Sequence, residues 1–250
     1  MKEKILPANR FEKIYRFGEV TSTMDVCEDL IKSGVCRGIV VAESQTSGRG
    51  RNAKKWSSKA NGNIYLSFFD ELNVGSIPQR CAVAAYSAVS QFVKKAEVVR
   101  IKWPNDILVG MKKVSGIIAK ILDFGGKKFY ICGIGINVFM PHEPEMNFVW
   151  EPAALNDYAE VGSGEVLNAI VESIDRAFSS EVSEIISVYK QNINWMIEKK
   201  IVFSQDLIRK ENGVITGFSD DFSVVKIDSE GCVKELSALS VLSVEYRREL

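Results

Sequence analysis

Apolar residues follow two different spacings along the first two hundred residues, and the alternation of these spacings predicts strands followed by helices. After Thr23, apolar positions recur at helical spacing until Ser33-Gly34, which predicts a helix that ends there. The run 39–42 is continuously apolar and short, which is typical of a buried strand. Residues 63–69 alternate between two faces and predict a second strand.

The same alternation continues through the middle of the chain. Ser76 and Gln79 have the spacing of a capping box, so a helix that extends to about residue 93 is predicted to begin beside them. Two strands are predicted at 114–124 and 129–138, and Gly125-Gly126-Lys127 joins them. Apolar residues at helical spacing predict two more helices, over 166–178 and 182–196. This order of elements indicates the α/β fold class.

The pattern changes after about Lys199. Short strand-like runs follow, at 201–203, 213–218, 222–227 and 232–236, with acidic and glycine-containing turns between them. Four or five short strands in about fifty residues predict a small β-barrel. We therefore expect a large domain over residues 1–198 and a small one over 199–250, with a boundary between Trp195 and Ile201.

Composition and charge indicate a cytoplasmic globular enzyme. The chain has 32 Lys and Arg residues and 32 Asp and Glu residues, so no net field favours nucleic acid or an anionic membrane. We find no apolar run that is long enough to span a bilayer and no signal-peptide pattern. The five cysteines have no CxxC spacing and are expected to be reduced core residues: Cys27, Cys36, Cys81, Cys132 and Cys232.

The single histidine excludes several kinds of catalytic site. His142 is expected in an exposed loop, and the chain has no G-x-S-x-G sequence for a hydrolase nucleophile. A metal site built from several histidines is excluded, and a G-x-x-x-x-G-K-[ST] phosphate loop is absent.

Residues 45–56 read Gln-Thr-Ser-Gly-Arg-Gly-Arg-Asn-Ala-Lys-Lys-Trp and contain the first candidate binding element. Glycine allows a main chain to approach a ligand closely, and arginine provides planar cationic groups that suit carboxylate and phosphate oxygens. The tryptophan at the end adds a flat face for a base. Taken alone, this run is also typical of a solvated basic turn.

Three later segments strengthen the case for an anionic, nucleotide-containing ligand. Lys-Trp-Pro-Asn-Asp at 102–106 follows a predicted strand, Lys-Lys-Val-Ser-Gly occupies 112–116, and Gly-Ile-Gly-Ile-Asn occupies 133–137. Polar side chains at strand ends are common at ligand sites of α/β proteins. Each segment alone is also consistent with a purely structural role, but their joint occurrence in this order favours a site.

Together these segments resemble those of the biotin protein ligases, over roughly residues 15–140. The matching positions are Ser22-Thr23, Gln45 with residues 48–51, Trp56, residues 102–106, Lys113 with Gly116, and residues 133–137. The resemblance implies a mixed β-sheet packed with helices and a small C-terminal SH3-like β-barrel. It also implies that biotin is activated with Mg·ATP as biotinyl-AMP and transferred to a lysine of a biotin carboxyl carrier protein domain, with a homodimer as a candidate assembly.

The resemblance and the chemistry together assign roles to individual residues. The catalytic cations are expected to be Arg51, Lys113 and Lys102. The residues expected to contact biotin are Ser22, Thr23, Gln45, Gly48, Arg49, Gly50, Arg51, Lys113 and Gly116. The residues expected to contact the nucleotide are Arg51, Trp56, Lys102, Asn105 and Asn137. Asp106 is expected to hold Mg²⁺ or to orient a lysine, and Trp103 is expected to pack in the core. The arginine-containing loop is expected to be mobile and to close over the acyl-adenylate.

Some positions depart from the family pattern. Met24, Ala53 and Lys120 stand where Asn, Gly and an acidic residue are common, and the family's usual Gly-Glu is missing from 240–243.

Two alternatives remain open. A lipoate or octanoate ligase shares the adenylation chemistry but needs only apolar walls around its acyl chain. A biotin-sensing repressor needs an N-terminal DNA-binding domain, and about twenty residues before Ser22 are too few for one. We therefore expect a ligase of the short form that does not bind DNA or membranes.

Overall fold

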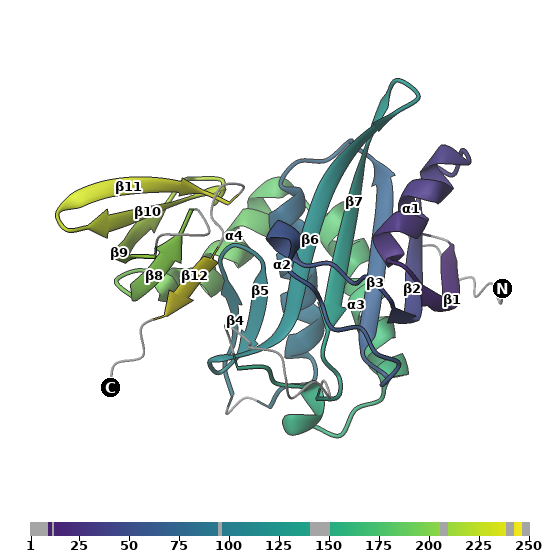
Figure 1. Ribbon diagram of the computed structural model, residues 1–250, viewed down its shortest axis with the longest axis horizontal. Coiled ribbons are helices and arrows are strands. Elements are labelled where there is room, and N and C mark those ends of the chain that lie inside the picture. Colours follow the sequence, from purple (N-terminus) through teal and green to yellow (C-terminus); the bar gives the residue numbers. More distant parts are fainter. Residues whose placement is uncertain are drawn as a thin grey trace.

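The computed structural model describes residues 10–11, 13–94, 97–140, 151–205, 210–238 and 243–246, and its larger sheet is mixed (Figure 1). The strands of this sheet are β1 (Ile14–Val20), β2 (Gly38–Gln45), β3 (Ile64–Glu71), β4 (Val99–Lys102), β5 (Asp106–Val109), β6 (Lys112–Phe124) and β7 (Lys127–Ile136). They are arranged in the order β1-β2-β3-β7-β6-β5-β4. The pair β1–β2 is parallel and the other pairs are antiparallel, which confirms the predicted mixed sheet.

Four helices pack on the two faces of this sheet. They are α1 (Thr23–Lys32), α2 (Ile77–Ser90), α3 (Ser163–Ser179) and α4 (Val182–Ile193). Helix α1 lies on one face, while α2 and α3 lie behind the sheet in Figure 1 and α4 contacts α2. Short 3₁₀ turns occupy Arg51–Ala53, Leu155–Asp157 and Asn194–Met196.

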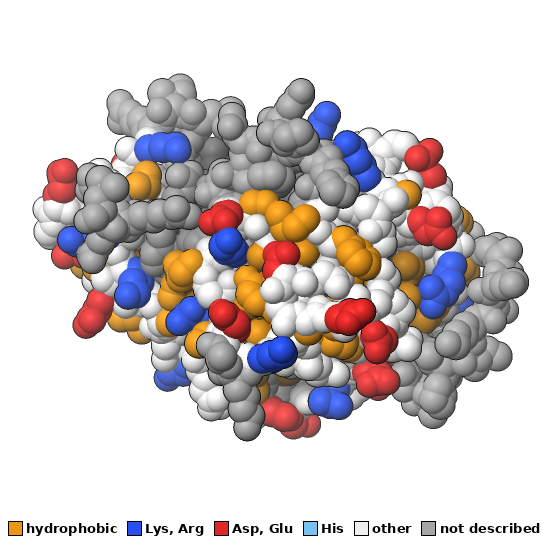
Figure 2. Space-filling model, turned by 90° about the horizontal axis from the view of Figure 1, so that it is seen from below, with side chains coloured by type: hydrophobic (Ala, Val, Ile, Leu, Met, Phe, Trp, Pro, Cys, Tyr) orange, Lys and Arg blue, Asp and Glu red, His pale blue; other side chains and the backbone are white. Residues whose placement is uncertain are grey.

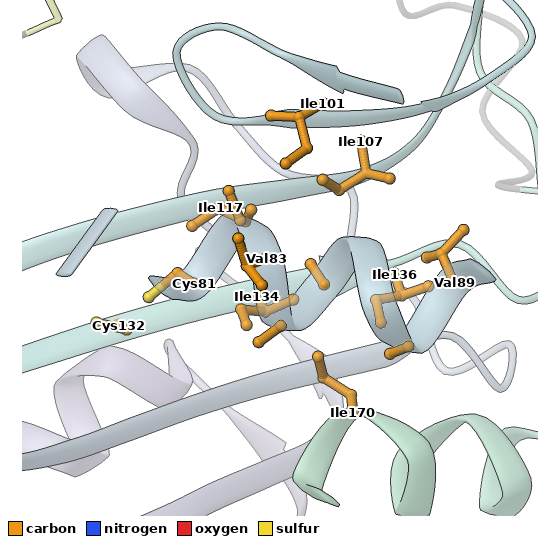
Figure 3. Close-up of a cluster of buried hydrophobic side chains, with 14 of the residues drawn as sticks. Cys81, Val83, Val89, Ile101, Ile107, Ile117, Cys132, Ile134, Ile136 and Ile170 are labelled. Atoms are coloured by element: carbon orange, nitrogen blue, oxygen red, sulfur yellow. The ribbon is translucent and has the colours of Figure 1, made fainter. Parts of the chain in front are cut away.

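The strands divide their apolar residues between these two faces. Ile39 belongs to the larger core cluster, which includes residues of α2, whereas its neighbour Val40 packs with Cys27 of α1. Successive side chains of a strand point to opposite faces, so a continuously apolar strand must be covered on both sides. Figure 3 shows the larger cluster, with Val83 and Val89 of α2 lying against Ile134 and other strand residues.

The predicted helices and strands of this domain are present, but the predicted capping box is wrong. Ser76 has a left-handed backbone conformation with φ 58°, and its side chain does not cap α2. Gln79 is buried, and its Nε2 donates a hydrogen bond to the carbonyl oxygen of Asp221 at 2.6 Å. The side chain of Gln79 therefore makes a tertiary hydrogen bond, although the local pattern predicts that it caps the helix.

The C-terminal strands form a second, antiparallel sheet. It contains β8 (Lys200–Ser204), β9 (Glu211–Phe218), β10 (Val224–Ser229), β11 (Cys232–Ser237) and β12 (Ser243–Tyr246), in the order β11-β10-β9-β8-β12. The predicted SH3-like barrel is not confirmed, because the strand pairings of the described residues leave β11 and β12 as two edges. Buried residues of this sheet, such as Phe203 and Val225, belong to the same core cluster as the large sheet. The division at residue 198 stays a prediction.

Surface features agree in part with the composition. Cys27, Cys81 and Cys132 are buried free thiols as expected, but Cys36 and Cys232 are exposed. Acidic and basic side chains are interspersed on the face shown in Figure 2. Within the described ranges, every helix is too short or too polar to cross a membrane. His142 lies outside the described residues.

Candidate active site

A cavity of about 480 Å³ lies where α1, the loop 48–56 and strands β3 to β7 meet. Most of the residues that the sequence singles out line it: Ser22, Thr23, Gln45, Arg49, Gly50, Arg51, Trp56, Lys102, Asn105, Asp106, Lys113 and Gly116. Gly48 and Asn137 are not among the residues that line it. Segments about ninety residues apart therefore contribute to one concave site, which is the usual form of a small-molecule site.

One end of the cavity carries neutral hydrogen-bonding groups, and we call Ser22, Thr23, Gln45 and Ser67 the polar end. The backbone N and Oγ1 of Thr23 both donate to Oε1 of Gln45, at 2.8 and 3.1 Å. Thr23 Oγ1 and Ser67 Oγ are 2.7 Å apart, and both side chains are buried. Nε2 of Gln45 donates to Ser58 Oγ at 2.8 Å. This network fixes which oxygen and nitrogen atoms face a ligand, because buried polar groups must be paired.

Helix α1 delivers two of these side chains because it begins at the cavity. Ser22 is its N-cap residue, and its Oγ accepts a hydrogen bond from Met24 N at 3.3 Å. Serine is a favoured N-cap because its side chain satisfies one of the unpaired N–H groups of the first turn. Ser22 therefore caps helix α1 and also belongs to the polar end, because the helix begins at the cavity.

The other end of the cavity is a cluster of charges, of which Lys102 and Asp106 are buried and Lys113 is half-buried, and we call these three residues the charged end. Asp106 Oδ2 lies 3.2 Å from Lys102 Nζ, and Asp106 Oδ1 lies 2.6 Å from Lys113 Nζ. Lys102 ends β4 and Asp106 begins β5, so a tight hairpin with a cis Trp103–Pro104 bond presents both side chains to the cavity. Lys113 comes from the start of β6.

Burial and ion pairing act in opposite directions on this cluster. Burial alone raises the pKa of the Asp106 carboxyl, but the positive charges of Lys113 and Lys102 outweigh it and lower that pKa to about 2. Burial lowers the pKa of Lys102, and Asp106 opposes that change. Asp106 is therefore an anion that keeps two cations in place near the ligand.

The two arginines of the loop have separate partners. Arg49 Nη2 pairs with Asp25 Oδ2 of α1 at 2.7 Å. Arg51 Nη2 donates to the carbonyl oxygen of Ala238 at the end of the C-terminal sheet. Both arginines line the cavity, so the loop contributes cations that are held from opposite sides.

Trp56 lies against the strands rather than at the cavity mouth. A Cβ atom at Gly116 would be 2.7 Å from its ring, and one at Gly135 would be 2.4 Å from it. These two glycines face each other across β6 and β7. Lys113 Nζ lies 5.2 Å from the centre of the indole, within the range of a cation–π contact. The glycines of the two strand motifs are thus explained by the space that an aromatic ring needs.

The loop 46–56 has more internal contacts than its composition indicates. Gly50 N donates to Lys54 O at 2.7 Å, and Trp56 N donates to Gly48 O at 3.0 Å. A Cβ atom at Gly48 would be 2.4 Å from Ser58 Oγ, so this glycine serves close packing. These contacts tie the loop to itself and to Ser58, while its expected mobility and its closure on ligand binding stay predictions.

The two asparagines hold the backbone around the site. Asn105 Nδ2 donates to Ile117 O at 2.8 Å, which ties the β4–β5 hairpin to β6. Asn137 is buried, and its Nδ2 donates to Ala153 O at 3.1 Å. Asn105 lines the cavity, whereas the predicted adenine contact of Asn137 stays a prediction. Trp103 is fully buried, which confirms its predicted packing role.

With this geometry established, the chain can be compared with known proteins. Residues 17–137, which contain all four motif segments, match the sequence model of the biotin/lipoate A/B protein ligase family. The chain is similar to this family over these residues, which are just under half of its length.

The curated relatives match different parts of the chain. The bifunctional ligase/repressor BirA of Bacillus spizizenii is 34% identical over 164 residues, which are 63% of this chain and 47% of the relative. A biotin–[acetyl-CoA-carboxylase] ligase of Mycobacterium tuberculosis is 33% identical over 109 residues, which are 40% of this chain and 39% of the relative. The chain spans about half the length, or less, of these curated relatives.

A solved ligase structure matches nearly the whole fold. The biotin protein ligase from Aquifex aeolicus, solved in complex with biotin and ATP, has a TM-score of 0.75 and 25% identity. The match covers 95% of this chain and 100% of that one. Both sheets of this chain therefore fall within a known arrangement.

Several residues in or next to the cavity were not predicted from the sequence. Ser67 stands in β3, where alternation places it on the same face as Tyr65 and Phe69, but nothing in the pattern shows that this face borders a cavity. Val244 lines the cavity from β12, and Asp25 holds Arg49. One feature of the sequence could have pointed to Ser67: it is a polar residue within an otherwise apolar strand.

Proposed function

We propose that this chain is an ATP-dependent biotin protein ligase. It activates the carboxylate of biotin as biotinyl-5'-AMP and transfers the biotinyl group to a lysine of a biotin carboxyl carrier protein domain. The observation that carries this proposal is the pairing, within one cavity, of a neutral polar end with a charged end. The printed names of the relatives, which include biotin–[acetyl-CoA-carboxylase] ligases, support the same substrate and carrier.

The first step joins two anions. An oxygen of the biotin carboxylate attacks the α-phosphorus of ATP, the bond to the β-phosphate breaks, and pyrophosphate leaves with that bond's electron pair. Because a carboxylate and a polyphosphate repel each other, the main need is for fixed positive charge in a site with little water. Lys113, Lys102 and Arg51 line the cavity and supply that charge.

The second step forms the product amide. The neutral amine of the carrier lysine attacks the acyl carbon, the bond to the phosphate oxygen breaks, and AMP leaves while the amine loses a proton. The mixed anhydride also reacts with water, so its burial protects it until the carrier arrives. Trp56 and residues of the loop 49–55 line the cavity, and we assign this protection to them.

We assign Asp106 to the orientation of Lys102 and Lys113, since both of its oxygens lie close to their ammonium groups. Among the described residues, three metal-binding side chains do not gather at any point. A resident magnesium site does not fit a carboxylate that is already neutralised by two lysines, and magnesium enters this reaction with ATP as its substrate complex. Asp106 as a magnesium ligand stays a prediction.

The polar end favours biotin over lipoate. A ureido ring carries donors and an acceptor that must be paired when the ring is buried, and Thr23, Gln45 and Ser67 provide such partners. An aliphatic acyl chain with a dithiolane ring needs apolar walls and has no ring donors or acceptors with which to use these groups.

The test compares the two acids directly. The protein is incubated with radiolabelled Mg·ATP and either biotin or lipoate, and acyl-AMP is measured, followed by transfer to a carrier domain. We expect biotinyl-AMP and a biotinyl-lysine amide. Acyl-AMP from lipoate and none from biotin would replace this function with that of a lipoate ligase.

We also propose that the protein does not act as a sequence-specific repressor, because its charge is balanced overall. Binding to a panel of genomic DNA fragments at physiological salt, with biotinyl-AMP present, is expected to be weak and unselective. A fragment bound tightly and selectively would assign it the second activity that BirA relatives carry in their names.

A further inference from the structure

The turn between β9 and β10 is a compact element of the C-terminal sheet that faces the large domain. Asp221 Oδ1 accepts hydrogen bonds from Ser219 Oγ at 2.7 Å and from Ser223 N at 3.1 Å. Phe222 is buried and has a left-handed backbone with φ 58°, which a bulky residue rarely adopts. Its ring packs on Tyr189 of α4 at a centroid distance of 5.2 Å. The turn is therefore held in one conformation from both sides.

Two neighbouring carbonyl groups of this turn accept hydrogen bonds from two different parts of the large domain. The Asp221 carbonyl accepts from Gln79 Nε2 of α2 at 2.6 Å. The Phe222 carbonyl accepts from Trp103 Nε1 at 2.9 Å. The left-handed conformation of Phe222 turns the backbone so that both contacts form at once.

The second contact reaches the charged end of the cavity. Trp103 is fully buried and is bonded covalently to Lys102, whose Nζ lies 3.2 Å from Asp106. The backbone N of Trp103 also contacts Met196 Sδ at 3.2 Å. Because the hairpin has only three residues between Lys102 and Asp106, a rotation of Trp103 must move one or both of these side chains.

The C-terminal sheet also borders the cavity at two other points. Val244 of β12 lines it, and the carbonyl of Ala238 accepts a hydrogen bond from Arg51. The small sheet thus contacts both cation-bearing segments, the loop 48–56 and the β4–β5 hairpin.

We propose that the turn 219–223 positions the charged end, and that Trp103 and Phe222 are the positioning residues through which it acts. The contact sets the direction of Lys102 and Asp106 without touching the ligand. This inference rests on the proposed ligase function for its kinetic test, and on geometry alone for a second test.

The two carbonyl contacts provide a matched pair of variants. Trp103→Phe removes the indole N–H that reaches the Phe222 carbonyl, and Gln79→Met removes the amide that reaches the Asp221 carbonyl. Each variant leaves one buried carbonyl of the same turn without its donor, so we expect similar losses of thermal stability. We expect Trp103→Phe to slow biotinyl-AMP formation about tenfold, which corresponds to a rise of about 1.4 kcal/mol in the activation free energy. Its dissociation constant for biotin should stay within about twofold, and Gln79→Met should keep the rate within about twofold.

A second measurement does not depend on the reaction. An amine-reactive reagent is applied without ligands, and labelling of Lys102 is followed by mass spectrometry with Lys112 as the internal standard. Lys102 is 3% exposed and Lys112 is exposed, so we expect slow labelling of Lys102 in the native protein. Trp103→Phe should raise that rate at least about threefold, and Gln79→Met should not, because only the first variant frees the hairpin.

The outcomes separate the two proposals. If the native protein makes no biotinyl-AMP, the proposed function fails and the labelling result still decides the positioning role. Equal slowing by both variants would show general loosening of the small sheet and overturn the inference. Unchanged rate and labelling in Trp103→Phe would also overturn it. If that variant does not fold, β-(3-benzothienyl)alanine at position 103 replaces the N–H by sulfur in a ring of the same size, and the same outcomes apply.

Discussion

The polar end and the charged end of the cavity are built in different ways. Thr23, Gln45 and Ser67 are neutral, come from α1 and two adjacent strands, and bond mainly to each other. Lys102, Asp106 and Lys113 are charged and come from three strands, β4, β5 and β6, at the other side of the sheet. Lys102 and Asp106 flank the β4–β5 hairpin, which the C-terminal sheet contacts. A neutral network discriminates between ligands by leaving wrong ones unpaired, whereas buried charges change the energy of a transition state. The comparison indicates that affinity and rate are controlled from opposite ends of one cavity.

The largest effect is expected from removal of a cation at the charged end. Lys113→Ala should slow biotinyl-AMP formation by about 10²- to 10³-fold, the usual effect of deleting one group that stabilises transition-state charge. Binding of preformed biotinyl-AMP should weaken far less. Single-turnover kinetics and calorimetry measure the two quantities. Lys112→Ala is the matched control, because Lys112 pairs with Glu151 at 2.6 Å on the surface. Equal losses in rate and affinity would make Lys113 a binding residue and remove the contrast between the two ends.

The second effect concerns stability and pH at the same end. The pKa of Asp106 is lowered to about 2, below an unfolded value of about 3.9. The unfolded chain therefore takes up the proton first as the pH falls, so the contribution of Asp106 is complete only above about pH 5 and is lost as the pH falls through 4 to below 2. It amounts to roughly 2–3 kcal/mol. The free energy of unfolding is measured with denaturant for the native protein and for Asp106→Asn from pH 6 to pH 2. The difference between the two free energies should become smaller as the pH falls. A constant difference would mean that the ion pairs do not stabilise the fold.

A smaller effect is expected at the polar end. Thr23→Val keeps the shape of the side chain but removes Oγ1, which contacts both Gln45 and Ser67. Biotin affinity should fall about tenfold, as for loss of one buried hydrogen-bonding group, while the rate at saturating biotin stays within about threefold. Thr21→Val, at an exposed neighbouring site, is the control. A loss of rate at saturation would show that the polar end also acts in the transition state.

The smallest effect tests the loop that connects the two ends. Asp25→Asn removes the partner of Arg49, which is 46% exposed at its side chain, and exposed ion pairs contribute little. Tryptic cleavage after Arg49 and Arg51 without ligand should rise about two- to fivefold, and biotin with ATP should suppress it. Glu28→Gln removes another ion pair of α1, with Lys120, and should leave the cleavage rate unchanged. Cleavage that is equally fast in all variants would favour the mobile loop predicted from its composition.

Most of the elements and most of the residues at the cavity could be predicted from the sequence. Periodicity is a local property, so the helices α1 to α4 and most strands of the large sheet follow from the spacing of apolar residues, whereas β1 and β5 were not predicted. Ser22 begins α1 and Lys102 ends β4, and both could be placed because caps and strand ends are also local. The glycines at 116 and 135 could be assigned to the site, but the indole that occupies the space above them could not.

Only the tertiary structure decided which side chains pair. Gln79 fits a capping box by spacing, yet it bonds to Asp221, which lies 142 residues away. Asp106 could be a metal ligand or a lysine partner by sequence, and the approach of two ammonium groups favours the second role. Val244 lines the cavity and Phe222 contacts Trp103 next to it, both from a sheet whose own pattern indicates only short strands. These contacts depend on the packing of one sheet against another, and packing is set by the shapes and partners of residues that are distant in the chain rather than by local spacing.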